Sequence, residues 1–276
     1  MSENGIAGNV AQVILEIRGN IAHITFDHVA ARNAMTVSMY QSLKSICEDL
    51  AKNPAVRVAI FRGAGGKSFV SGSDIAQFAS FQNGSDGVRY EEDIDSYLAP
   101  LAALPIPSIA VIDGMAVGGG LAIASCCDFR FSTPGAKFGV PIAKTLGNCL
   151  SAGNIAWLAA HLGINVVKRM LLLAEMISAE ELAKQGYVFA IHEQEHLSQE
   201  ADKLAERLSK LAPITQKSSK LVLARLIKNN LPDCNDLITE TYGSNDFKNG
   251  VAAFLKGQPP CWTGKKKKNI SCRLLR

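Results

Sequence analysis

The sequence predicts an α/β protein with a helical C-terminal segment. Apolar, β-rich runs alternate with helical patterns over about the first 190 residues, and only helical patterns occur from Leu197 onward. In the middle of the chain, residues 109–128 have the pattern of a buried strand, a glycine turn and the start of a helix. At 276 residues the chain is long enough for one large domain, or for one domain with an appendage.

The N-terminal elements are predicted in the order β, β, α, β. Apolar runs at 13–17 and 21–26 are joined by the turn-forming residues 18–20, which predicts a hairpin. Thr36 is placed to cap a helix whose apolar residues recur at three- and four-residue spacing. The apolar stretch 56–61 then predicts the next strand.

The middle of the chain alternates between polar and apolar stretches. Residues 82–92 are polar and contain glycine, so we expect a mobile loop over a site, followed by a helix that reaches Leu104. Residues 109–112 and 129–131 are apolar and predict strands, whereas 138–141 predicts a turn.

The C-terminal third is mostly helical in pattern. Helices are predicted at 153–162 and 166–173, and the capping box at 178–181 opens another. A short strand is predicted at 187–191, and helices follow from Leu197 onward.

The formal net charge of +4 comes from the C-terminal end of the chain. The last twelve residues hold six basic side chains and no acid, which leaves 23 basic and 25 acidic residues elsewhere. We expect residues 259–276, with the lysine run 265–268, to form a disordered tail. Binding of nucleic acid or of an anionic membrane surface by these lysines is the alternative. The 47% hydrophobic and 20% charged composition is typical of a globular protein.

The sequence predicts a cytoplasmic protein. Its N-terminus lacks the basic start and the apolar core of a secretory signal, and its apolar runs are too short for a membrane span. The seven cysteines are scattered and form no C-x-x-C pair, which predicts reduced thiols and no metal site.

The glycine run at 118–120 has two interpretations. Consecutive glycines at a helix start leave main-chain N–H groups uncovered, and the helix dipole adds partial positive charge there. Such a terminus can hold a phosphate, or the oxygen of a carbonyl that becomes negative during a reaction. In the other interpretation, the glycines only let the helix and the strand pack closely.

Five short motifs stand in order along the chain. They are R-N-A-M at 32–35, F-V-S-G-S-D-I at 69–75, the stretch 107–128 with its three glycines and C-D end, A-K-F-G-V-P at 136–141, and N-G-V-A-A-F at 249–254. Together they make the chain similar, from about Val13 to Phe254, to the crotonase, or enoyl-CoA hydratase/isomerase, superfamily. The resemblance implies a crotonase spiral of repeated β-β-α units, with C-terminal helices that mediate trimer formation.

The resemblance also implies an acyl-CoA site. Members of the family stabilise an enolate-like thioester oxygen with two main-chain N–H groups, which fall at Ser73 and Gly119 here. The positions that match the family's substrate contacts are Arg32, Ser71, Asp74, Ile75, Gly118 and Phe254. For Arg32, an exposed surface charge is the alternative. CoA is part of the substrate, so no separate cofactor and no metal are implied.

Two positions depart from the family pattern. Hydratases of the family use two glutamates as general acid and base, and this chain has Ala122 and Ile142 at those positions. Neither side chain transfers a proton, so the resemblance alone predicts neither hydration nor isomerisation. Candidate replacements are Asn148, as a group that polarises a carbonyl or holds a water, and Cys149, as a nucleophile. The acids of the expected loop are further candidates: Asp86, Glu91, Glu92 and Asp93.

Three functions follow from these observations. The first is an acyl-CoA-processing lyase or isomerase whose reaction passes through a thioester enolate. The second is an acyl-CoA-binding protein without catalysis, and the third is a thioester hydrolase or decarboxylase of the same superfamily. We expect residues 1–195 to form the core with the site and 196–258 the helical segment, and we expect a homotrimer or hexamer.

Overall fold

The computed structural model describes residues 10–229 and 231–264. Its larger sheet has six strands in the order β1-β2-β3-β4-β6-β9. Their bounds are β1 Gln12–Arg18, β2 Ile21–Asp27, β3 Val58–Gly63, β4 Ser108–Ile112, β6 Phe129–Ser132 and β9 Ala190–Ile191. β1 and β2 form the predicted antiparallel hairpin, and the later neighbours pair in parallel. The predicted strands of this sheet are therefore confirmed, with the third displaced by two residues.

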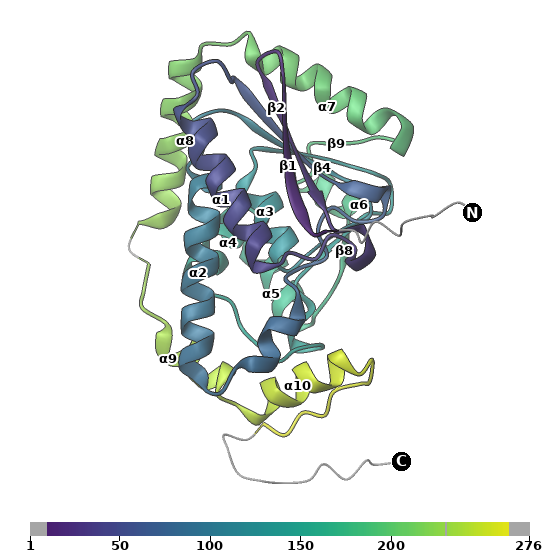
Figure 1. The fold of residues 1–276 in the computed structure, drawn as a ribbon, viewed down its shortest axis with the longest axis vertical. Helices are drawn as coiled ribbons and strands as arrows, with labels where there is room; N and C mark the ends of the chain where they lie inside the picture. The colour runs from purple at the N-terminus through teal and green to yellow at the C-terminus, as the bar shows by residue number, and fades with distance from the viewer. Residues whose placement is uncertain (1–9, 230, 265–276) are drawn as a thin grey trace, which may run out of the picture.

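Helices bury both faces of this sheet (Figure 1). They are α1 (Val37–Lys52), α2 (Gly84–Ala102) and α3 (Gly119–Cys126) on one face and α7 (Gln194–Ser209) on the other. Phe61 and Ile112 belong to the core on the first face, whereas Ile60 and Val111 pack against α7. Because side chains alternate across a strand, the unbroken apolar runs of β3 and β4 supply both faces.

A second, three-stranded sheet lies next to the glycine run. It has the order β5-β7-β8, with bounds Met115–Val117, Lys137–Gly139 and Ile177–Ser178. The turn predicted at 138–141 is wrong at its start, because Phe138 and Gly139 belong to β7 and a 3-10 helix, Pro141–Ala143, follows. The reason is distant pairing, since β7 runs parallel to β5 some twenty residues earlier.

The polar stretch 82–92 is a helix start and not the expected loop. The side chain of Asn83 accepts from the N–H of Ser85, and the carboxylate of Asp86 accepts from the N–H of Asn83, which closes a capping box. The glycines inside α2 serve packing. A Cβ at Gly87 would stand 2.1 Å from the ring of Tyr242. α2 therefore carries its acids in fixed directions and not on a mobile segment.

The remaining helices follow the predicted order. They are α4 (Ala152–Leu162), α5 (Ile164–Leu172), α6 (Ala179–Lys184), α8 (Pro213–Lys228), α9 (Asn235–Tyr242) and α10 (Asn245–Leu255). α9 and α10 lie at the end of the molecule where α2 begins (Figure 1).

The lysine run 265–268 lies outside the described residues. Among the described helices, none is both long and apolar enough to cross a membrane. Of the six cysteines in the described part of the chain, five are free thiols and Cys261 is disulfide-bonded, which corrects the expectation of reduced thiols at that position.

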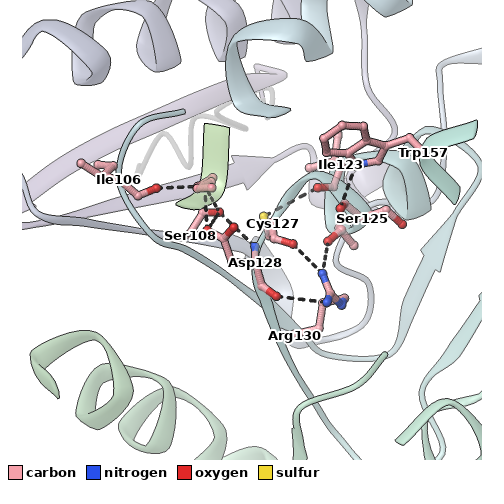
Figure 2. A network of polar contacts seen from close by, with 10 residues as sticks. Ile106, Ser108, Ile123, Ser125, Cys127, Asp128, Arg130 and Trp157 are labelled. Carbon is pink, nitrogen blue, oxygen red and sulfur yellow. Dashed lines mark hydrogen bonds and ion pairs between the residues drawn. The ribbon is translucent and has the colours of Figure 1, made fainter. Parts of the chain in front are cut away.

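The end of α3 is held by side chains from neighbouring elements (Figure 2). The buried guanidinium of Arg130 donates to the carbonyl oxygen of Cys127 at 2.5 Å and to that of Ala124 at 3.2 Å. The indole N–H of Trp157 donates to the carbonyl oxygen of Ser125 at 2.9 Å. These bonds satisfy carbonyl groups that a helix C-terminus leaves unpaired, so the position of α3 is well determined.

Asp128 follows α3 and has a structural role. One of its carboxylate oxygens accepts from the N–H and the hydroxyl of Ser108 at 2.7 and 2.8 Å (Figure 2). The same oxygen pairs with the ammonium of Lys220 on α8 at 2.6 Å. Asp128 thereby connects the C-terminal end of α3 to β4 and α8. These contacts help to fix the position of α3, including its glycine-rich N-terminus.

Candidate active site

A cavity of about 380 Å³ lies where the sequence motifs converge. Its wall includes residues of α1, α2, the N-terminus of α3, the segment 140–154 and α10. Of the residues predicted from the sequence, the following line it: Ser71, Ser73, Asp74, Ile75, Gly118, Gly119, Asn148 and Phe254. Segments that are far apart in the chain thus form one chamber.

The N-terminus of α3 opens into this cavity. Gly118 has φ 52°, a left-handed conformation that suits glycine, and its own N–H donates to the carbonyl oxygen of Gly139 at 2.9 Å. Gly119 is the first residue of α3, so the helix provides no acceptor for its N–H. In the described part of the chain, this N–H donates to no main-chain oxygen. It is therefore available to a ligand in the cavity.

The second predicted donor, the N–H of Ser73, lies beside the first. Met35 donates to the carbonyl oxygen of Gly72 and accepts from the N–H of Asp74, both at 2.8 Å, in an isolated parallel bridge. In such a bridge the central residue directs its own N–H away from the partner, and the N–H of Ser73 has no main-chain acceptor among the described residues. The hydroxyl of Ser73 lies 3.5 Å from the position of a Cβ built on Gly119.

Two tyrosine hydroxyls join Ser73 in the cavity wall. The hydroxyl of Tyr40 lies 2.9 Å from Oγ of Ser73, and that of Tyr90 lies 2.7 Å from the same atom. Burial raises the pKa of Tyr40 to about 12 and that of Tyr90 well above 10. Both phenols therefore keep their protons at neutral pH. Neither hydroxyl was identified from the sequence.

The two positions without the family's glutamates also face the cavity. Ala122 and Ile142 line it and bring no titratable group. Of the four acids that the sequence offered on 82–93, Glu91 alone lines this cavity. Asp86 and Asp93 line a separate pocket beyond Tyr40, and Glu92 is exposed.

Glu91 has the features of an acid–base group. Its side chain is buried, with the residue 2% exposed, and lies at the end of the cavity on α2. The hydroxyl of Tyr242 donates to one carboxylate oxygen at 2.6 Å, and the N–H of Ser151 donates to the other at 2.8 Å. Burial raises the pKa of Glu91 to about 7, against the two hydrogen bonds, which lower it. A carboxyl with this pKa exchanges a proton readily near neutral pH.

The two predicted replacements differ in their positions. Asn148 donates through Nδ2 to the hydroxyl of Tyr242 at 3.2 Å, and its buried Oδ1 has no partner among the described residues. Cys149 is half-buried and does not line the cavity, and burial raises the pKa of its thiol to about 11. Asn148 is thus a lining residue whose Oδ1 is buried without a partner, whereas the protonated thiol of Cys149 is a poor nucleophile.

The predicted CoA contacts line the cavity, with the exception of Arg32. Phe254 is 49% exposed and lines the cavity of its own chain. Arg32 is exposed, has φ 53° and is not part of the wall. Among the described residues that form the wall there is no lysine, arginine or histidine. The cavity thus suits an uncharged group, with polarity concentrated at Ser73, Gly119 and Glu91.

The chain has clear relatives. Residues 16–265 match the family model described as enoyl-CoA hydratase/isomerase. Over 258 residues, the chain is 31% identical to the (E)-benzylidenesuccinyl-CoA hydratase of Thauera aromatica, and the match covers 91% of this chain and 99% of the relative. Over 248 residues, it is 29% identical to the short-chain-enoyl-CoA hydratase of Clostridium acetobutylicum, with 88% and 94% covered.

Solved structures have the same fold. A crystal structure of an enoyl-CoA hydratase/carnithine racemase from Magnetospirillum magneticum has a TM-score of 0.74 at 30% identity and covers 92% of this chain and 96% of its own. A methylmalonyl-CoA decarboxylase in complex with 2-nitronate-propionyl-CoA has a TM-score of 0.84 over 94% of this chain and 100% of its own. At 22% identity, it shows the fold alone. The predicted crotonase-like α/β fold is confirmed. The chain belongs to the enoyl-CoA hydratase/isomerase family, within the crotonase superfamily.

Proposed function

We propose that this protein acts on acyl-CoA thioesters through a thioester enolate, with Glu91 as its acid–base group. The observation that carries the proposal is that Glu91, a buried carboxylic acid with a raised pKa, is a lining residue of the same cavity as Ser73 and Gly119, whose N–H groups have no main-chain acceptor among the described residues. The named relatives act on CoA thioesters, which supports the substrate class. The reaction favoured is the reversible addition of water to a 2-enoyl thioester.

The two N–H groups bind the thioester oxygen. Negative charge gathers on this oxygen when the enolate forms, so donors that are already in place stabilise the enolate more than the substrate. Losing one such donor typically costs about 100- to 1,000-fold in rate. The fixed position of α3 keeps the Gly119 donor in place, and the bridge to Met35 does the same for the Ser73 donor.

A single carboxyl suffices for the proton transfers. Water adds to C3 of the enoyl group and loses a proton to the Glu91 carboxylate, while the electron pair of the double bond moves into the enolate. Glu91 then returns the proton to C2. The product is a 3-hydroxyacyl thioester, and the carboxylate is regenerated.

Asn148 favours water addition over the alternatives. It lines the cavity, its buried Oδ1 has no partner among the described residues, and its Nδ2 donates to the same Tyr242 hydroxyl that donates to Glu91. A decarboxylase substrate carries a free carboxylate besides the thioester, and the described wall has no cation to hold it. The role of the glutamates absent at Ala122 and Ile142 thus passes to Glu91 and Asn148.

The proposal includes substrate contacts and assembly. Ser71, Asp74, Ile75, Gly118 and Phe254 are positioned to contact CoA, and Arg32 lies outside this group. A homotrimer or hexamer is supported by exposed apolar side chains on α8, which are Ile214, Val222, Leu223 and Leu226. Sedimentation of the purified protein tests the assembly.

The test of the function is incubation with crotonyl-CoA. Loss of the enoyl absorbance is followed, products are separated by chromatography, and calorimetry measures binding. We expect the absorbance to fall with formation of a 3-hydroxybutyryl thioester. Release of free CoA indicates a hydrolase instead. Binding without turnover indicates an acyl-CoA-binding protein without catalysis, and absence of binding overturns the whole proposal.

A further inference from the structure

The hydroxyls of Tyr40, Ser73 and Tyr90 form a cluster in which one hydroxyl proton is not used in a hydrogen bond within the cluster. The cluster has three hydroxyl protons and two O···O contacts, at 2.9 and 2.7 Å. Within the described residues, these three hydroxyls make no further hydrogen bond. Because all three residues line the cavity, the third proton, which has no further acceptor among the described residues, is available to a ligand that replaces water there.

The chemistry of the hydroxyls determines which atom carries the spare proton. A phenol is a stronger hydrogen-bond donor and a weaker acceptor than an aliphatic alcohol. This difference favours Tyr40 and Tyr90 as the donors to Oγ of Ser73, an arrangement in which the Ser73 proton is directed elsewhere. Two donors to one oxygen also polarise its O–H bond and strengthen the hydrogen bond that it gives.

The Ser73 hydroxyl lies close to Gly119 at the start of α3. A Cβ on Gly119 would stand 2.2 Å from the Tyr40 hydroxyl and 3.5 Å from Oγ of Ser73. The cluster thus lies against the first turn of α3, beside the N–H groups of Gly119 and Ser73. Ser73 presents two donors to this place, its N–H from the main chain and its O–H from the side chain.

We propose that the Ser73 hydroxyl is a third hydrogen-bond donor to the thioester oxygen, held in its donating orientation by the hydroxyls of Tyr40 and Tyr90. This inference rests on the proposed function, because it concerns the same enolate. It assigns the two tyrosines as positioning residues, which act through Ser73. The site then favours substrates whose negative charge develops fully on the thioester oxygen.

Binding of two CoA ligands tests the inference. In 2-nitronate-propionyl-CoA the negative charge is delocalised over the nitro group and the thioester oxygen, whereas the acyl group of propionyl-CoA is neutral. We expect Ser73→Ala to weaken nitronate binding by about 10- to 100-fold and propionyl-CoA binding by less than about threefold, because hydrogen bonds to charged groups are the stronger ones. The Tyr40→Phe/Tyr90→Phe double variant keeps the Ser73 proton, so its loss of nitronate affinity is smaller.

The matched control is Ser125→Ala. Ser125 also makes a buried hydroxyl contact with a tyrosine, Tyr187, at 2.9 Å, but neither residue lines the cavity. Ser125→Ala removes a buried Ser–Tyr hydrogen bond but no group that faces the cavity. We therefore expect its affinity for both ligands to equal that of the wild type. The inference is overturned if Ser73→Ala binds the nitronate as tightly as the wild type does, or if it loses equal affinity for both ligands. In either case, binding of these ligands by the wild type still supports the proposed function. If the wild type binds neither ligand, the proposed function fails, and this inference fails with it.

Discussion

The Glu91 carboxylate and the Tyr242 hydroxyl lie 2.6 Å apart, although 151 residues separate them in the chain. α9 supplies the hydroxyl and α2 supplies the carboxylate, and the glycine at position 87 lets the two helices approach closely. The contact places the C-terminal helices in the candidate active site. Tyr242 at the end of α9 lowers the pKa of Glu91 through its hydrogen bond. Phe254 and Leu255 of α10 form part of the cavity wall.

Replacement of Glu91 by Gln is the direct test of its role. We expect kcat for crotonyl-CoA hydration to fall by about 100- to 10,000-fold, because the variant keeps the shape and loses the proton-transfer group. We expect KM to change little, since Glu91 is not among the proposed CoA contacts. Steady-state kinetics at saturating substrate measures the effect.

Glu92→Gln is the control for this change. Glu92 is the next residue on α2, it is exposed, and it does not line the cavity. Its activity should equal that of the wild type. A Glu91→Gln enzyme with wild-type kcat would remove Glu91 from the mechanism and return attention to Asn148.

The rate should depend on pH through the Glu91 carboxylate. Its pKa is raised to about 7 by burial, and addition of water needs the deprotonated form. We therefore expect kcat/KM to rise with pH through a midpoint near 7 and then to level off. The Tyr242 hydrogen bond lowers this pKa, so in Tyr242→Phe the midpoint moves to higher pH. A pH profile with the same midpoint in both proteins contradicts the assignment.

The same pKa has a consequence for stability. In the unfolded chain Glu91 ionises at its usual pKa of 4.5, whereas the native protein holds the proton until about pH 7. Between these values the native state binds more protons than the unfolded state, so raising the pH lowers the free energy of unfolding. From about pH 5 to about pH 8 the wild type should lose about 3 kcal/mol relative to Glu91→Gln. Urea unfolding of both proteins at the two pH values measures the difference, and parallel curves would refute it.

The order of the elements was largely predictable from the sequence because it rests on local patterns. The cap at Thr36 and the apolar spacing of α1 are local features, and the Thr36 side chain does accept from the N–H of Met39. β5 and β7 were missed or misjudged because each is only three residues long and exists through pairing. Short strands carry too little periodicity to be distinguished from turns.

The site was predictable only as far as its main-chain part. The motifs indicate where Ser73 and Gly119 stand, and these residues do lie together in the cavity wall. Nothing near Glu91 distinguishes it from Glu92, because its burial comes from Tyr242 and Ser151, far along the chain. The glycines of α2 indicated a loop for the same reason, since their packing partners belong to α9.

Gly119 offers a test of the geometry at the helix start. A Cβ there would stand 2.2 Å from the Tyr40 hydroxyl, far inside contact distance. Gly119→Ala should therefore displace Tyr40, disturb Ser73 and lower kcat/KM by about 10- to 100-fold, in line with the cost of overpacking and of a misplaced donor. Steady-state kinetics with crotonyl-CoA measures the loss.

A second substitution should restore much of that activity. Tyr40→Phe removes the hydroxyl that collides with the methyl group introduced at position 119, and the nearest remaining ring atom is then 3.5 Å from that methyl group, an ordinary contact. Gly119→Ala/Tyr40→Phe should therefore be more active than Gly119→Ala alone. Tyr97 stacks on Tyr40 with ring centroids 5.9 Å apart, so Tyr97→Phe in the Gly119→Ala background is the matched control and should restore nothing. Equal activity in both double variants would mean that the loss does not come from the Tyr40 clash. A double-mutant cycle over positions 40 and 119 gives the coupling directly, because the two groups are in contact only when both the methyl and the hydroxyl are present.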